Sequence, residues 1–197
     1  MRRAWQQTKE ERHGQVVFVS GEPGIGKSAL VDTLRRAARA EGFTRITFRC
    51  SPYHTNSALY PLAEHWKRLA GWQPEDDNAA RLAKLEEVLA GYRLPREEAV
   101  PLFASLLSLP PGDGYPRLDL TPEQLKEHTE DALVALSLEE AERQSLLEVF
   151  EDVHWADPST LDLLGQLIEQ APTAPVLIVL TFRPEFTPPW PARSARR

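Results

Sequence analysis

The sequence predicts an α/β protein with a mostly parallel central sheet. A short apolar run at 16–19 leads into a glycine-rich loop, and an amphipathic helix pattern with Leu30 and Leu34 on one face follows at once. Two further apolar runs, at 146–152 and 176–182, lie on either side of another helical pattern. The run at 176–182 is the most apolar of the chain, as expected for a strand in the middle of a parallel sheet.

The loop after the first strand carries a phosphate-binding pattern, G-x-x-x-x-G-K-S. Its glycines let the backbone curl so that successive N–H groups point inward at phosphate oxygens. The following helix directs its positive dipole end at the same anion. Lys27 can reach the β- and γ-phosphates as a point charge, and the Ser28 hydroxyl can bind Mg²⁺. The residues expected to bind the phosphates are Gly21-Glu22-Pro23-Gly24-Ile25-Gly26-Lys27-Ser28.

Composition narrows the class of protein. The chain has 197 residues, 42% hydrophobic and 26% charged, which is an ordinary globular balance for one α/β domain with a sizeable core. A formal charge of -6 gives no support to nonspecific nucleic-acid binding. Cys50 is the single cysteine, so no internal disulfide forms and a reducing, cytoplasmic setting fits. No apolar run approaches the ~20 residues of a membrane span, and the N-terminus lacks a signal-peptide core.

The remaining elements follow from periodicity and caps. Residues 45–50 alternate polar and apolar, which indicates a strand near a sheet edge. Three apolar stripes at helical spacing occupy 58–112, and Thr121 with Gln124 forms a capping box that starts another helix. The expected strands are 16–19, 45–50, 146–152 and 176–182, and the expected helices are 28–41, several within 58–112, 121–143, and one from Ser159 or Thr160 to 170.

A second piece of chemistry stands at the end of the third strand, where Glu151 and Asp152 follow the apolar run. Catalytic groups of α/β proteins gather at the carboxyl ends of parallel strands. One carboxylate can hold Mg²⁺ through water, because this ion keeps several waters and takes few protein ligands. The other can polarise the attacking water. By position we favour Glu151 for the metal and Asp152 for the water, although the two roles can be exchanged.

Further candidates lie near these strand ends. Arg183 follows the last strand, where phosphate-loop proteins sense the γ-phosphate, and its planar fork suits a phosphate. The alternative is a surface arginine at a strand end. His154, Trp155 and Asp157 either line the nucleotide site or an interface, or Trp155 packs against the sheet while Asp157 or Ser159 caps the next helix.

Five motifs occur along the chain in a fixed order: Gly21-Glu22-Pro23-Gly24-Ile25-Gly26-Lys27-Ser28, Cys50-Ser51-Pro52-Tyr53-His54, Asn56-Ser57-Ala58-Leu59-Tyr60-Pro61, Glu151-Asp152-Val153-His154-Trp155-Ala156-Asp157-Pro158-Ser159-Thr160, and Thr181-Phe182-Arg183-Pro184-Glu185. Together they resemble the AAA-type ATPase module of bacterial STAND regulators (signal-transduction ATPases with numerous domains). The likeness is closest to modules found between adenylate/guanylate cyclase domains and tetratricopeptide repeats, and it spans nearly the whole chain.

The resemblance implies a three-layer P-loop NTPase fold with parallel strand order 5-1-4-3-2 and a helical insertion between strands 2 and 3. It implies ATP and Mg²⁺ as cofactors, slow ATP hydrolysis, and a switch in which nucleotide state gates attached output domains such as cyclases or repeats. Carried over residue by residue, it assigns 21–28 to the phosphates, Ser28 and Glu151 to the metal, and Lys27, Glu151, Asp152 and Arg183 to catalysis.

The domain organisation follows from the same resemblance. We expect residues 1–185 to form the ATPase domain, with the insertion at about 58–143, and 186–197 to be a disordered Pro/Arg-rich tail. Members of the family are several hundred residues or longer. We therefore expect this chain to be a fragment that begins inside the helix before strand one and ends before the fifth strand and a helical lid.

Glu148 departs from the family pattern, which is apolar at this position. A carboxylate inside a central strand destabilises the fold unless it is paired or protonated. The acid at position 148 therefore favours a competing hypothesis, in which the chain is a nucleotide-binding scaffold that no longer hydrolyses ATP. A small-molecule kinase is another hypothesis, but no run of arginines after the last helix offers a lid. A DNA-binding regulator lacks support, because no helix-turn-helix pattern occurs in these residues.

Overall fold

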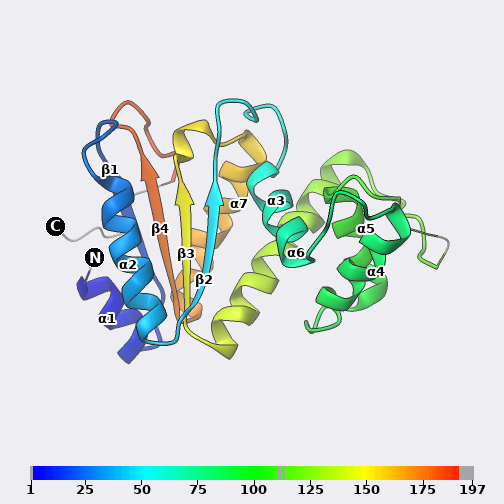
Figure 1. Ribbon diagram of the computed structural model, residues 1–197, viewed down its shortest axis with the longest axis horizontal. Helices are drawn as coiled ribbons and strands as arrows, with labels where there is room; N and C mark the ends of the chain where they lie inside the picture. The colour runs from blue at the N-terminus through cyan, green and yellow to red at the C-terminus, as the bar shows by residue number, and fades with distance from the viewer. Residues whose placement is uncertain (1, 111, 113, 191–197) are drawn as a thin grey trace. The chain divides into compact units, whose positions relative to one another are not determined.

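The computed structural model describes residues 2–110, 112 and 114–190. Figure 1 shows strands and helices alternating along the chain, with a run of helices between β2 and β3. The elements are α1 (Arg2–Glu10), β1 (Gln15–Ser20), α2 (Lys27–Ala40), β2 (Thr44–Arg49), α3 (Tyr60–Leu69), α4 (Asn78–Leu89), α5 (Arg96–Leu106), α6 (Pro122–Arg143), β3 (Leu146–Glu151), the 3₁₀ turn η1 (Val153–Trp155), α7 (Pro158–Gln170), the 3₁₀ turn η2 (Ala171–Thr173) and β4 (Val176–Phe182).

The chain divides into two compact units. One is formed by the residues up to Tyr60 and from Ser137 onward, and the other by Pro61–Leu136. The first unit contains the whole sheet and every candidate site residue. The second unit is helical. No helix in the described part of the chain is both long and apolar enough to cross a membrane.

The sheet of the first unit has four strands in the order β1-β4-β3-β2, and every neighbouring pair is parallel. The predicted α/β class with a parallel sheet is therefore confirmed. All strands point their carboxyl ends to the same edge, which is also where the loop after β1 begins. The bounds of β4 are those predicted from its apolar run, 176–182.

The sheet differs from the implied order 5-1-4-3-2 in that no fifth strand lies beside β1 among the described residues, while the four strands present keep the order 1-4-3-2. Four strands are present among the described residues, with β1 at one edge. The segment after β4 runs to α7 instead of adding a strand. The indole N–H of Trp190 donates to the carbonyl of Leu161 at 3.0 Å, and a Cβ on Gly165 would lie only 3.0 Å from the Trp190 ring. Residues 191–197 of the expected tail lie outside the described residues.

Alternation along β3 and β4 divides the core into two layers. Leu147, Val149, Leu177 and Val179 face one side, where they pack with α1 and α2. Residues 148, 150, 178 and 180 face the other side and are also buried. Figure 1 shows α2 in front of the strands and α7 behind them. Helices thus cover both faces of the sheet, as parallel sheets require.

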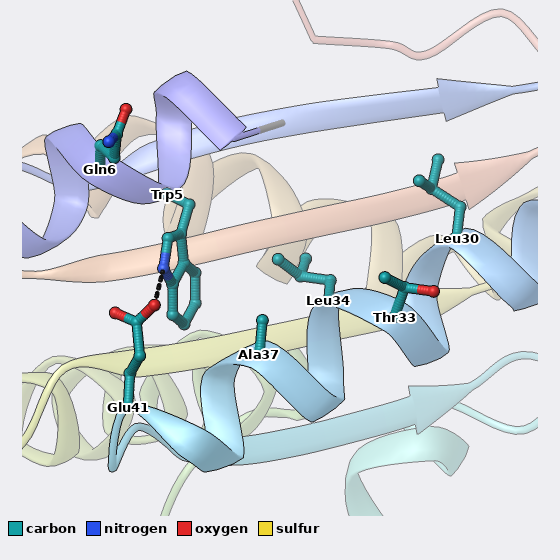
Figure 2. A pocket seen from close by; sticks show the side chains of 7 residues that line it. All are labelled: Trp5, Gln6, Leu30, Thr33, Leu34, Ala37 and Glu41. Carbon is teal, nitrogen blue, oxygen red and sulfur yellow. Dashed lines mark hydrogen bonds between the residues drawn. The ribbon is translucent and has the colours of Figure 1, made fainter.

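Helix α1 is fixed to this layer by one aromatic residue, Trp5. Its ring stacks on Phe43 with centroids 3.9 Å apart, and its indole N–H donates to Glu41 Oε1 at 3.3 Å. A groove of about 480 Å³ remains between α1 and α2. Figure 2 shows the side chains that line it, with Leu30 at one end and Glu41 at the other. Its floor is apolar, formed by side chains such as Leu34 and Ala37.

Helix α6 of the helical unit begins with the predicted capping box. The backbone N–H of Gln124 donates to Thr121 Oγ1 at 3.2 Å, and the Thr121 N–H donates to Gln124 Oε1 at 2.9 Å. This reciprocal pair satisfies two backbone donors that the helix leaves free. Within the same unit, Trp66 packs edge-on against Phe103 with centroids 4.4 Å apart. The apolar stripes predicted for this region therefore form a core.

Candidate functional site

The glycine-rich loop joins β1 to α2 at the carboxyl edge of the sheet. Gly24 and Gly26 adopt left-handed backbone conformations, with φ of 80° and 103°. A Cβ at either position would meet nothing within 4 Å, so the backbone angle and not crowding requires glycine there. The Gly21 N–H donates to the carbonyl of Phe182 at 3.3 Å, which joins the start of the loop to the end of β4.

Lys27 begins α2 and turns its side chain back over the loop. Its ammonium donates to the carbonyl oxygens of Gly21 at 2.5 Å and Glu22 at 2.9 Å. Gly26 caps the helix without a side chain, so no side-chain oxygen occupies the N–H groups of the first turn. Ser28 and most of the loop are exposed. A positive helix end, open amides and an ammonium group together fit an anion such as a phosphate.

Glu151 ends β3 and is held by two arginines. Its Oε1 accepts from Arg35 on α2 at 2.6 Å, and its Oε2 accepts from Arg49 at the end of β2 at 2.8 Å. The Glu151 side chain is only 15% exposed. Both carboxylate oxygens are therefore engaged by a cation, although each retains a second lone pair that can accept another ligand.

Asp152 leaves the strand that was expected to include it. Its backbone is left-handed, with φ of 57° and ψ of 44°, and its N–H donates to the hydroxyl of Thr181 on β4 at 3.0 Å. This turn places the Asp152 side chain in an exposed position beyond the strand end. The two adjacent acids thus differ, since Glu151 lies in an ion-pair cluster and Asp152 faces solvent.

Arg183 follows β4 directly and is half-buried. Its guanidinium carbon lies 5.6 Å from the centroid of the Trp155 ring, a cation–π geometry. The backbone N–H of Trp155 donates to the backbone carbonyl of Asp152 at 2.9 Å. Arg183 is therefore placed beside the turn that follows β3, and not on an isolated part of the surface.

The imidazole of His154 lies in the turn after Asp152, next to the Trp155 ring. Burial lowers the pKa of His154; the carboxylates of Asp152 and Glu185 raise it, and the positive charges of Arg183 and Lys27 lower it. Backbone contacts join the same region, because Gly21 of the loop bonds to Phe182 and Asp152 bonds to Thr181, the two residues that precede Arg183. Glu151, by contrast, turns toward α2 and β2.

Sequence reasoning missed three residues of this region: Arg35, Arg49 and Thr181. Arg49 could have been found, because residues 49 and 151 are in register on neighbouring parallel strands. Arg35 carried no such signal, since it lies 116 residues from Glu151 in the chain. The apolar run of β4 also gave no sign that the Thr181 hydroxyl accepts a hydrogen bond from the Asp152 N–H.

Asp157 caps α7. This was one of the two alternatives predicted for the residue, the other being a place in the nucleotide site or an interface. The residue is 2% exposed. Its Oδ1 accepts the N–H groups of Thr160 at 3.0 Å and Leu59 at 3.2 Å, and its Oδ2 accepts the Thr160 hydroxyl at 2.5 Å. Helix α7 therefore begins at Pro158, before the predicted Ser159 or Thr160. The same carboxylate joins the loop after β2 to this helix.

The thiol of Cys50 also lies in this region. Burial raises the pKa of the Cys50 thiol to about 12, which leaves no reactive thiolate at neutral pH.

Replacing Asp157 by alanine is expected to lower the free energy of unfolding by about 2 kcal/mol, because it leaves buried N–H donors without an acceptor. Urea unfolding of the purified chain measures this. Asp77→Ala is the matched control, since Asp77 is an exposed N-cap whose side chain accepts the Ala80 N–H at 2.8 Å. It should cost about 1 kcal/mol or less. Equal losses in the two variants would contradict a special role for the buried cap.

The parallel sheet, the glycine loop before α2 and the acidic end of β3 define a phosphate-loop nucleotide-binding domain. The sequence profile of the AAA ATPase domain family matches residues 1–179. The chain belongs to this family. It is also 33% identical over 181 residues to an uncharacterized protein of Rhizobium meliloti (strain 1021), in an alignment that covers 90% of this chain. The alignment covers 17% of that relative's length, so the chain corresponds to a small part of it.

An AAA ATPase domain uses a nucleotide and usually Mg²⁺, and the residues present fit both. Lys27 already donates to carbonyl oxygens at the loop, where phosphate oxygens would be alternative acceptors. Among the described residues no group of three or more His, Cys, Asp or Glu side chains is placed to hold a metal ion alone. Mg²⁺ binds through one or two protein oxygens together with water and phosphate, and the Ser28 hydroxyl and the carboxylates of Glu151 and Asp152 are oxygen donors of this kind.

Proposed function

We propose that the chain is a Mg-ATP-binding ATPase module whose nucleotide state controls attached domains. The observation that supports it most is the loop with open amides and Lys27, whose first residue bonds to the end of β4, where Asp152 also bonds and Arg183 follows. A cation for the phosphates, an exposed acid and a second cation are the groups that phosphoryl transfer to water needs.

The roles follow from the position of each group. The loop amides and Lys27 bind the phosphates, and Ser28 with a carboxylate of the 151–152 pair holds Mg²⁺, which neutralises charge on the phosphate oxygens when bound. Asp152, the exposed acid, orients and accepts a proton from the attacking water. Arg183 binds the terminal phosphate. We retain Glu151 as the favoured metal ligand, which would bind the ion while competing with the charges of Arg35 and Arg49.

The control of attached domains is proposed from the length of the relative, of which this chain matches only 17%. A module that forms a small part of a long chain can transmit its nucleotide state to neighbours in the same polypeptide. Cyclase domains and tetratricopeptide repeats are the output domains that the motifs favour.

A nucleotide-binding scaffold without hydrolysis is the second candidate. It is favoured by the two arginines on Glu151 and by the buried carboxylate of Glu148, which is 1% exposed. The two candidates share the phosphate site and differ only in turnover. Both are therefore tested first by binding.

Lys27→Ala is expected to weaken ATP binding about tenfold or more, because it removes a charge-assisted contact worth about 1.5–3 kcal/mol. Isothermal titration with ATP, with and without Mg²⁺, measures the affinity. Lys9→Ala is the control: Lys9 is a half-exposed lysine of the same unit and pairs with Glu41 at 2.8 Å. Equal affinities in wild type and Lys27→Ala would remove the phosphate-site proposal.

A further inference from the structure

His154 carries two buried polar atoms that nothing in the described part of the chain satisfies. Both ring nitrogens, Nδ1 and Nε2, are inaccessible to solvent and have no hydrogen-bond partner. A neutral imidazole has one N–H donor and one acceptor nitrogen, so both capacities are unused. Buried groups of this kind are rare in native proteins, and each calls for an explanation such as a ligand, an ion or a catalytic role.

The surroundings of the ring indicate which ligand chemistry would satisfy it. The charged groups that act on it come from three elements: Lys27 from the start of α2, Asp152 from the end of β3, and Arg183 with Glu185 from the segment after β4. Its other neighbour is the Trp155 ring, 5.0 Å away between centroids. Two cations and an exposed acid around an unsatisfied imidazole favour an anionic group that carries oxygen acceptors and ordered water.

We propose that His154 contacts the terminal phosphoryl group of a bound nucleoside triphosphate and thereby distinguishes ATP from ADP. The proposal rests on the proposed function, because it presumes that the loop at 21–28 holds the other phosphates. His154 follows Asp152 by two residues and neighbours the Trp155 ring, which Arg183 contacts, and Asp152 and Arg183 are the residues proposed to act at the terminal phosphoryl group. One ring nitrogen donates to a phosphate oxygen, and the other accepts a hydrogen bond from water at the same site.

The backbone supports a fixed position for this ring. His154 is the middle residue of η1, whose first residue, Val153, is fully buried. The turn is tied at Asp152 to Thr181 by a 3.0 Å hydrogen bond, and Trp155 lies against Arg183. The backbone that carries the ring is thus held before the nucleotide arrives, and the atoms that cover the two nitrogens must move aside for a phosphate oxygen to reach one of them.

The test compares the affinities of ATP and ADP in His154 variants. Titration with Mg²⁺ and either ADP or a non-hydrolysable ATP analogue is expected to show that His154→Ala weakens the ATP analogue about tenfold and changes ADP affinity less than twofold. His154→Asn and His154→Gln reproduce the reach of Nδ1 and Nε2 respectively. The variant that restores the preference for ATP identifies the nitrogen that donates to the phosphate.

His13→Ala is the matched control, since His13 is an exposed histidine of the same unit. Equal weakening of both nucleotides by His154→Ala would indicate a structural role and overturn the proposal, as would an unchanged ratio in all three His154 variants. Lys27→Ala is titrated alongside. If it binds like wild type, the proposed function itself fails. If Lys27 is required and the ratio still does not depend on His154, only this inference fails.

Discussion

Asp152→Asn is expected to lower steady-state ATP turnover about 100-fold or more while Mg-ATP affinity stays within a few-fold of wild type. A positioned general base contributes roughly 10²–10⁴ to the rate, and the amide cannot accept the proton of the attacking water. Asparagine suits this position structurally, because it tolerates the left-handed backbone that Asp152 adopts at φ 57°. The N–H that donates to Thr181 belongs to the backbone and is retained.

Asp162→Asn provides the control for this prediction, because Asp162 is an exposed acid on α7 that the proposed mechanism does not use. Glu151→Gln is measured in parallel. If it abolishes turnover while Asp152→Asn alters mainly the Mg²⁺ dependence, the roles of the two acids are exchanged. If neither acid matters and Lys27 still governs binding, the scaffold without hydrolysis is the better description.

The parts of the fold that were predictable are those whose physical cause is local. The capping box of Thr121 and Gln124 needs only residues three apart, and both of its hydrogen bonds are present. The bounds of β4 follow from one uninterrupted apolar run. The loop conformation follows from glycines at the two positions with positive φ, Gly24 and Gly26. In each case neighbouring residues decide the structure before tertiary packing acts.

The parts that were not predictable depend on which distant side chains meet. Sequence order indicates that the ends of β3 and β4 lie at one edge, and therefore that Asp152 and Arg183 are close. It does not indicate that Glu151 turns to Arg35 and Arg49 while the next residue leaves the strand. The two acids differ because the Thr181 hydroxyl holds the turn at Asp152, while α2 brings Arg35 to Glu151. The different surroundings of these adjacent residues could be seen only in the structure.

Glu148 is the clearest case of a sequence anomaly whose solution is tertiary. The residue is 1% exposed in β3, between Ile46 and Ile178 on the neighbouring strands. Its Oε1 accepts from the Ser137 hydroxyl at 2.9 Å, and its Oε2 has no partner among the described residues. Burial raises the pKa of the Glu148 carboxyl to about 7, against the opposing effect of the Ser137 hydrogen bond. One hydroxyl thus compensates only part of the burial.

The stability of the fold should therefore fall as the pH rises from about 4.5 to about 7. In this window the folded chain retains a proton on Glu148 that the unfolded chain, with an ordinary pKa of 4.5, has lost. The unfolded state then binds fewer protons, so the free energy of unfolding decreases by up to about 1.4 kcal/mol per pH unit and about 3 kcal/mol in all. The stabilisation is complete below the unfolded pKa and is lost as pH passes the folded pKa.

Urea unfolding between pH 4.5 and 8.5 measures this dependence in wild type, Glu148→Gln and Glu148→Leu. Both substitutions remove the titrating group, so both should remove the fall of about 3 kcal/mol, and Glu148→Leu should exceed wild type in stability above pH 7.5 because it also removes the unpaired oxygen. Glu10→Gln, on the exposed side of α1, should retain the wild-type profile. A wild-type profile in Glu148→Gln would mean that the fall has another source and that folding does not raise the pKa of Glu148. β3 would then accommodate a buried charge, and the anomaly would not account for a loss of stability near neutral pH.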